Sequence, residues 1–310
     1  MLVPVLIVLL IAGALVNPRF LTAENLIDIL GASSALALIV LGESLVLIVG
    51  KFDLSLESTV GLGPALGVLL TASAADRGWG VGLSPWLGLL AIVGFGALVG
   101  ALNGLLIVRF RLNAFIVTLA MLIILRGLLV GLTKGNTLFA VPAPYLYLGA
   151  ATWLAVPVSV WFAGACYVVA AIVLRYHRYG RALYAIGGNA RAALAAGIAV
   201  ESTTWWCFIV AGVLAAIAGL VLTGRLGAVG ASQGNGMIFT VFAAAVIGGV
   251  SLDGGRGTIA GALTGVLLLG VLDNLLTLSQ VQTYWIQAIY GAIILIALVI
   301  ARMTRGSEET

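Results

Sequence analysis

Residues 86–133 read WLGLLAIVGFGALVGALNGLLIVRFRLNAFIVTLAMLIILRGLLVGLT. The stretch holds two long apolar runs, 86–108 and 113–133, divided by the short segment Arg109-Phe110-Arg111-Leu112. A helix needs about 20 predominantly apolar residues to cross the hydrocarbon core of a bilayer. The pair therefore predicts two transmembrane helices that are joined by a tight turn at one membrane surface.

The composition extends this prediction to the whole chain. Of its 310 residues, 62% are hydrophobic and only 8% are charged, whereas a soluble domain carries about 25% charged residues. So few charges cannot cover a water-facing surface. No stretch is long and polar enough to form an extramembrane domain, so we expect residues 1–310 to be a single transmembrane domain. The net charge of +4 does not indicate nucleic-acid binding, because the basic residues lie at segment ends.

Apolar runs recur along the chain and predict an all-α bundle of about ten transmembrane helices. We expect the first run to be a retained helix and not a cleaved signal peptide, because no small-residue cleavage site follows it. The runs are 2–16, 26–49, 55–74, 86–108, 113–133, 153–174, 203–223, 236–252, 257–276 and 284–301.

Basic residues predict the orientation, because short cytoplasmic loops carry an excess of Lys and Arg. With a cytoplasmic N-terminus, the external side carries Arg19, Arg77, Lys134 and Arg225. The cytoplasmic side then carries the larger set, which is Lys51, Arg109, Arg111, Arg175, Arg178, Arg181, Arg191, Arg256, Arg302 and Arg305. We therefore expect both termini to be cytoplasmic.

The longest polar stretch, residues 175–202, falls on the predicted cytoplasmic side. It contains an Ala-rich segment that predicts a short helix, with Asn189 as its N-cap and Gly197 as its stop. Such a helix either docks on a soluble partner or lies at the membrane surface without one. The residues alone leave both interpretations open.

Glycines recur at intervals of four in two segments, 96–106 and 257–267, whose sequences also resemble each other. Glycines four residues apart share one helix face and let two helices approach closely in lipid. At the same offset, Asn113 corresponds to Asn274. The predicted topology gives the two helices opposite directions, which fits an internal inverted repeat. The alternative is that two unrelated helices share a common packing pattern.

Polar residues within apolar runs are candidates for a translocation path, because ionisable groups are costly in a membrane and commonly functional. They are Glu43, Asn103, Arg126, Asp273 and Asn274. The alternative is that Glu43 and Arg126 pair with each other, or with the backbone, and only fix helix packing.

The segment 50–58 interrupts two apolar runs and adds Asp53 and Ser55 to the candidate path. Both residue types favour helix N-termini, and transporters place broken helices along the solute path. The segment therefore predicts a broken helix, although an ordinary cytoplasmic turn would explain the same residues.

The sequence offers no basis for catalysis. It lacks the phosphate-binding loop pattern, and Lys51 and Lys134 are the only lysines. His177 is the only histidine, and no Cys or carboxylate cluster has the spacing of metal ligands. We therefore expect no catalytic residue, cofactor, metal site or ATPase activity in this chain.

The chain resembles the permease subunits of bacterial ABC importers for monosaccharides, of the ribose, xylose and galactofuranose type. Four segments carry the resemblance, and they are Leu41 to Leu56 with its Asp-Leu-Ser motif, Asn103 to Leu119, Ala185 to Val200, and Arg225 to Asn274. Glu43 departs from the family's pattern, and Lys51 and Glu57 add charge around the Asp-Leu-Ser motif. These departures leave the solute open.

The resemblance implies a multi-pass protein of the bacterial inner membrane. It implies a homodimer or heterodimer of permeases, two cytoplasmic ATPase subunits, and a periplasmic or extracellular solute-binding protein that delivers a sugar. It also makes residues 175–202 the coupling loop. Within that loop, the positions that match the family's ATPase-coupling pattern are Gly187, Asn189, Ala192 and Gly197.

Two other functions stay open at this point. The same architecture could import a branched-chain amino acid or an autoinducer. An ion-coupled secondary transporter would instead use Glu43, Asp273 and Arg126 as a proton or sodium relay.

Overall fold

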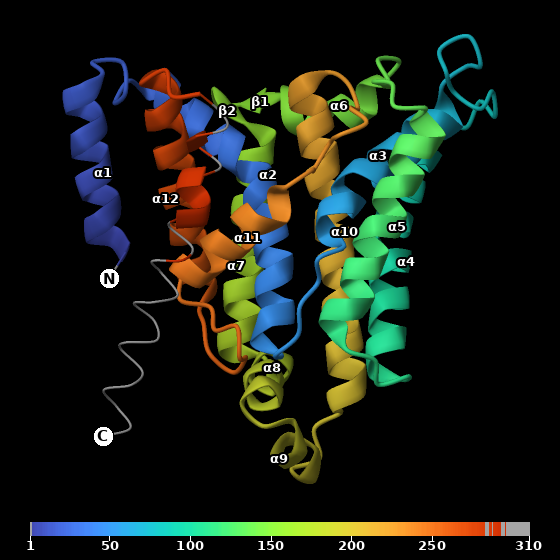
Figure 1. Ribbon diagram of the computed structural model, residues 1–310, viewed down its shortest axis with the longest axis vertical. Helices are drawn as coiled ribbons and strands as arrows, with labels where there is room; N and C mark the ends of the chain where they lie inside the picture. The colour runs from blue at the N-terminus through green and yellow to red at the C-terminus, as the bar shows by residue number, and fades with distance from the viewer. Residues whose placement is uncertain (1, 283–284, 287, 293–294, 296–310) are drawn as a thin grey trace.

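The computed structural model describes residues 2–282, 285–286, 288–292 and 295. This part of the chain is mostly helical, as the apolar runs predict (Figure 1). Six of its helices are long and apolar enough to cross a membrane, and they are α2 (Ala23–Ile48), α4 (Pro85–Val108), α5 (Ala114–Thr133), α7 (Val158–Tyr176), α10 (Val200–Leu226) and α12 (Ile259–Leu278).

Three further apolar helices are shorter, and they are α1 (Leu2–Val16), α3 (Leu56–Thr71) and α11 (Met237–Ile247). Each of the first nine predicted runs therefore contains a helix. The tenth run, 284–301, falls largely outside the described residues.

Short elements join the long helices, and they are α6 (Ala143–Ala150), β1 (Thr152–Trp153), β2 (Val156–Pro157), α8 (Arg178–Gly188) and α9 (Ala190–Ala195). The two strands form an antiparallel hairpin whose turn residues, Leu154 and Ala155, have positive φ angles. The predicted helix over 153–174 was wrong at its start, because this hairpin occupies the first residues and α7 begins only at Val158. Helix α6 was not predicted.

Local sequence explains where the long helices begin. The hydroxyl of Thr22 accepts a hydrogen bond from the backbone N–H of Asn25, and Ser84 and Thr258 do the same for α4 and α12. Pro85 follows Ser84 at the first helical position, where its missing N–H costs nothing. These caps fix the ends of the helices that surround the core.

Helix α10 lies at the centre of the packing and contacts α2, α3, α4 and α6. Gly96 and Gly100 of α4 face the backbone of α10 at Gly212 and Phe208, where a methyl group would collide with a carbonyl oxygen. The glycine spacing therefore brings two backbones together, as small residues do in lipid.

A second small-residue contact joins α12 to α11. Gly261 and Gly265 of α12 face the backbone at Gly248 and Ala244. Gly257 has the same spacing but precedes the helix, with a φ of +138°. Asn113 caps α5, whereas Asn274 lies inside α12, so these two asparagines have different structural roles.

The short elements lie at the two opposite ends of the bundle (Figure 1). Helices α8 and α9 lie together at one end, and α6 with the β1–β2 hairpin lies at the other. Between them, α3 and α11 each begin well inside the bundle, so neither crosses its full length.

Candidate functional site

A break between α2 and α3 places polar groups inside the bundle. Helix α2 ends at Ile48, and Gly50 turns the chain with a φ of +73°. An extended segment then leads from the α8 end of the bundle to the start of α3 (Figure 1). The interpretation of 50–58 as an ordinary surface turn is wrong, because Asp53 and Ser55 are fully buried.

Four of the predicted path residues meet at this break. The Asp53 carboxylate accepts hydrogen bonds from the backbone N–H of Ser55 at 3.0 Å and from its hydroxyl at 2.6 Å. The amide of Asn103 donates to the Ser55 hydroxyl at 2.8 Å, and Oε1 of Glu43 accepts from the Asp53 N–H at 3.3 Å. Ser55 makes no side-chain cap of α3, contrary to prediction, because its hydroxyl is engaged with Asp53.

All four side chains are fully buried, so a polar atom among them that lacks a hydrogen-bond partner cannot bond to water instead. Oε2 of Glu43 and Oδ1 of Asn103 have no hydrogen-bond partner within the described part of the chain. Unsatisfied buried polar atoms are uncommon in native proteins. The cluster therefore joins α2, α3 and α4 through polar contacts that are only partly satisfied.

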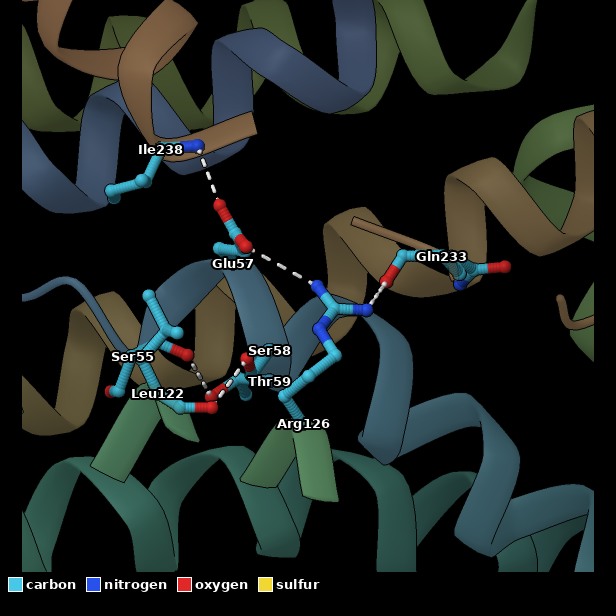
Figure 2. A network of polar contacts seen from close by, with 8 residues as sticks. All are labelled: Ser55, Glu57, Ser58, Thr59, Leu122, Arg126, Gln233 and Ile238. Carbon is cyan, nitrogen blue, oxygen red and sulfur yellow. Dashed lines mark hydrogen bonds and ion pairs between the residues drawn. The ribbon is translucent and has the colours of Figure 1, made fainter. Parts of the chain in front are cut away.

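Arg126 belongs to a second polar group, and its suggested pairing with Glu43 was wrong. Its Nη2 lies 3.3 Å from Oε1 of Glu57, and its Nη1 donates to the Gln233 carbonyl oxygen at 3.1 Å (Figure 2). The second Glu57 oxygen accepts from the backbone N–H of Ile238 at 3.1 Å. Glu57 was missed as a site residue, although its charge beside the Asp-Leu-Ser motif was a signal.

Glu57 serves the N-terminus of α11, which the local sequence leaves uncapped. The N-cap residue, Gly236, has no side chain and a φ of +80°. A helix N-terminus carries free N–H groups and a partial positive charge, which a carboxylate stabilises. A carboxylate in the first turn of α3 therefore holds the first turn of α11.

Gln233 fixes the segment that leads into α11. Its side-chain amide donates to the carbonyl oxygens of Val60 and Gly219 and to the Thr223 hydroxyl, at 3.0 to 3.3 Å. No periodic pattern signals this role, because Gln233 lies in an irregular segment between α10 and α11.

Asp273 and Asn274 lie in a third group, apart from the other candidates. Asn274 exchanges two hydrogen bonds with Asn25, at 2.9 and 3.0 Å. Oδ1 of Asp273 accepts from the Tyr290 hydroxyl at 2.9 Å. Both residues line a cavity of about 520 Å³ between α2, α10, α11 and α12.

The predicted helix within 175–202 is confirmed as α9. Oδ1 of Asn189 accepts from the backbone N–H groups of Arg191 and Ala192 at 3.1 and 3.0 Å. Gly197 follows the helix with a φ of +79°, as a stop residue should. Ala192 is exposed on the surface of α9.

Helix α8 was missed, because the segment was interpreted as a polar loop. It is amphipathic, and its buried face consists of Gly180, Ala182, Leu183 and Ile186. This face packs on α7, α10 and α2.

Gly187 joins α8 to the end of α2 and to the loop before α12 by backbone contact. A methyl group at Gly187 would collide with the Ile48 carbonyl oxygen and with the backbone N–H of Gly255. These two groups are themselves hydrogen-bonded at 2.8 Å. The Tyr184 hydroxyl donates to the Gly257 carbonyl oxygen at 2.9 Å, and burial raises the pKa of this phenol.

The described residues contain no group of three or more His, Cys, Asp or Glu side chains that could hold a metal ion. Cys166 and Cys207 are both free thiols.

A helical membrane bundle whose short helices begin inside the core is typical of a membrane transport subunit. Residues 25–298 match the family described as "Branched-chain amino acid transport system / permease component". The chain belongs to this family of permeases. It is a multi-pass protein of the inner membrane and a transport component, not an enzyme.

Known relatives cover nearly the whole chain. The "Ribose import permease protein RbsC" of Escherichia coli (strain K12) is 34% identical over 95% of this chain and 91% of its own length. The protein of the same name from Bacillus subtilis (strain 168) is 35% identical, with coverage of 96% and 90%. The "L-arabinose transport system permease protein AraH" of Escherichia coli (strain K12) is 33% identical, with coverage of 98% and 90%. No solved structure matches the chain.

Proposed function

We propose that this chain is the membrane-spanning subunit of an ABC importer that translocates a monosaccharide by alternating access. The similarity to ribose and arabinose permeases over nearly the full chain carries the proposal. A solute-binding protein delivers the sugar at the external end, and two cytoplasmic ATPases drive the cycle. A second permease, identical or different, completes the pathway.

The proposed topology has ten spanning segments, with both termini cytoplasmic, in one permease domain over residues 1–310. The end of the bundle that carries α8 and α9 is then cytoplasmic (Figure 1). The basic residues Arg175, Arg178, Arg181 and Arg191 lie in this region, which supports the orientation. Helices α4 and α12, which carry the two similar glycine-spaced segments, run in opposite directions through the bundle, and this supports an inverted repeat (Figure 1).

Helices α8 and α9 are the proposed docking segment for the ATPase, with Gly187, Asn189, Ala192 and Gly197 as its shaping residues. Leu194 on α9 is 65% exposed, and Ala192 on the same helix is also exposed. An exposed apolar group on a short helix, beyond the spanning segments, suits a protein partner.

The backbone junction at Gly187 gives docking a route into the bundle. Movement of α8 acts directly on Ile48, at the end of α2, and on Gly255, in the loop before α12. The extended segment after Ile48 continues to Asp53 and Ser55, and then to Glu57 at the start of α3. The docking segment is thus connected to the Asp53 cluster, and to Glu57 beside Arg126, by the backbone contact at Gly187 and the chain that continues from Ile48.

Co-purification with the candidate ATPase tests this function. The unaltered chain should retain the ATPase in stoichiometric amount, and Leu194→Glu and Ala192→Glu should each release it. Leu154→Glu is the matched control, because Leu154 is an exposed leucine in the β1–β2 hairpin at the opposite end. If the unaltered chain retains no ATPase, the importer assignment fails and an ion-coupled transporter becomes the better explanation.

A further inference from the structure

A cavity of about 520 Å³ opens between α2, α10, α11 and α12, and no side chain of the two buried polar clusters lines it. Its volume falls within the range of about 300–1,000 Å³ that small-molecule sites occupy. Its walls come from the first half of α2, the last turn of α10, the first turn of α11 and the second half of α12. These parts of α10 and α12 lie at the end of the bundle opposite α8 and α9 (Figure 1).

The wall combines charged and hydroxyl-bearing side chains. It includes the carboxylates of Asp28 and Asp273, the guanidinium of Arg225, and the hydroxyls of Ser33 and Thr240. Among the described residues, Arg126 and Glu57 form an ion pair, whereas Asp28 and Arg225 form none. The hydrogen-bonding capacity of these two groups is therefore available to a ligand.

Ser33 is the most informative member of the wall. It is 5% exposed, and its hydroxyl has no hydrogen-bond partner within the described part of the chain. It faces Gly270 of α12, where any larger residue would collide with the hydroxyl oxygen. Burial of an unpaired hydroxyl destabilises the fold, and a ligand in the cavity would offset this cost by supplying the missing partner.

We propose that this cavity binds a neutral polyhydroxylated ligand of monosaccharide size that enters from the external end. The inference rests on the proposed import function and assigns the ligand class to this site. Carboxylates accept hydrogen bonds from sugar hydroxyls, and the guanidinium donates to sugar oxygens. The ring of Tyr290, held by Asp273, provides an amphipathic surface beside them.

Charge selects this class over an anionic solute. The wall carries two carboxylates and one guanidinium, so its net charge is negative when all three groups are ionised. A ligand with net negative charge would meet net repulsion from this wall, whereas a neutral polyol would not.

The cavity also connects to the ion pair at Arg126. Met237 and Thr240 in its wall belong to the first turn of α11, whose Ile238 N–H is held by Glu57. A ligand that displaces this turn acts directly on the Glu57–Arg126 contact. Occupancy of the external cavity is thereby coupled to α3, which leads back to the docking segment.

Cysteine protection in the full-length chain, reconstituted in lipid nanodiscs, tests the site. In a Cys166→Ser/Cys207→Ser background, Thr240→Cys should react with N-ethylmaleimide at a rate that D-ribose or L-arabinose slows at least threefold. L-Leucine should have no effect. Thr264→Cys on α12, outside the cavity wall, is the control, and its rate should be independent of sugar.

Two further variants test the polar groups, each with a matched control. Asp273→Asn and Ser33→Ala should abolish the protection, whereas Asp76→Asn, in the loop before α4, and Ser34→Ala should retain it. Ser34 is the neighbouring buried serine, and its hydroxyl is already bonded to the Gly31 carbonyl oxygen at 2.6 Å. Size-exclusion profiles confirm folding of each variant.

The outcomes separate this proposal from the import function. Protection by leucine and not by either sugar overturns the ligand class. Absence of protection by any solute, in a chain that still retains its ATPase and supports sugar uptake, overturns the site and leaves the importer assignment intact.

Discussion

Nη2 of Arg126 lies 3.3 Å from Oε1 of Glu57, and this contact joins α5 to α3 inside a membrane bundle (Figure 2). The Glu57 side chain is 6% exposed and that of Arg126 is 19% exposed, so water screens the pair only weakly. Because the other Glu57 oxygen holds the first turn of α11, the pair links three helices. The break in the bundle is therefore held by charge as well as by packing.

Removal of either partner should destabilise the protein, because the remaining charge would be buried without compensation. We expect Glu57→Gln and Arg126→Met each to lower the free energy of unfolding by about 3 kcal/mol. The double variant should be less destabilised than the sum of the two, by about 0.5–3 kcal/mol. Denaturation in detergent measures the cycle, and Glu201→Gln, at an exposed position on α10, is the control. Strictly additive losses would show that the two side chains do not interact.

The backbone junction at Gly187 should not tolerate a methyl group. Gly187→Ala places a carbon atom against the Ile48 carbonyl oxygen and should displace α8 from the end of α2. We expect ATP hydrolysis by the assembled transporter to become uncoupled from sugar uptake, with uptake reduced at least tenfold. Gly188→Ala is a matched control, because open space surrounds the neighbouring glycine. Equal uptake by the two variants would remove the junction from the coupling route.

The helices of this fold are partly predictable from the sequence, because the composition and periodicity of one segment show whether it forms a buried or membrane-spanning helix. The apolar runs predict the long helices, and the Asn189 to Gly197 pattern predicts α9. The same reasoning missed α8, since its apolar face is narrow and its charges suggest a loop. It also missed the hairpin at 152–157, whose apolar residues resemble the start of a spanning helix.

The candidate site was predictable as a set of residue types but not as a set of contacts. Glu43, Asp53, Ser55 and Asn103 were all identified, and they meet in one cluster. Arg126 was identified without its partner, because Glu57 is 69 residues away in sequence and the choice between two nearby glutamates depends on how α3 is oriented. Asp273 was grouped with the others, yet tertiary packing places it in a separate cavity.

The two buried carboxyl groups of the Asp53 cluster should respond differently to amide replacement. Asp53→Asn can keep the oxygen that accepts from Ser55, but it replaces Oδ2, which accepts from the Asn103 amide at 3.5 Å, with a second NH2 donor. Two donors then face each other in a buried site, which should cost about 1–3 kcal/mol. Glu43→Gln preserves the oxygen that accepts from the Asp53 N–H and removes an acid from the bundle interior. Its unfolding free energy should be unchanged or slightly higher.

Transport assays distinguish a structural role of Glu43 from a relay. We expect Glu43→Gln to retain uptake that depends on the ATPase and resists an uncoupler. Loss of uptake in a fully folded Glu43→Gln protein, together with sensitivity of the unaltered protein to the uncoupler, would favour the ion-coupled alternative.

The close approach of α4 to α10 should depend on the glycines of α4 that face α10 and not on the other glycines of that helix. At Gly100 a methyl group would overlap the Phe208 carbonyl oxygen, whereas at Gly94 of the same helix nothing lies within 4 Å. Gly100→Ala must therefore separate the two helices and lose their packing contacts, and we expect a loss of at least 2 kcal/mol. Gly94→Ala should be neutral or stabilising by up to about 1 kcal/mol, because alanine favours the helix over glycine. Thermal unfolding of both variants in the same detergent gives the comparison. Similar midpoints would mean that the helices are not in backbone contact, and the central position of α10 would need revision.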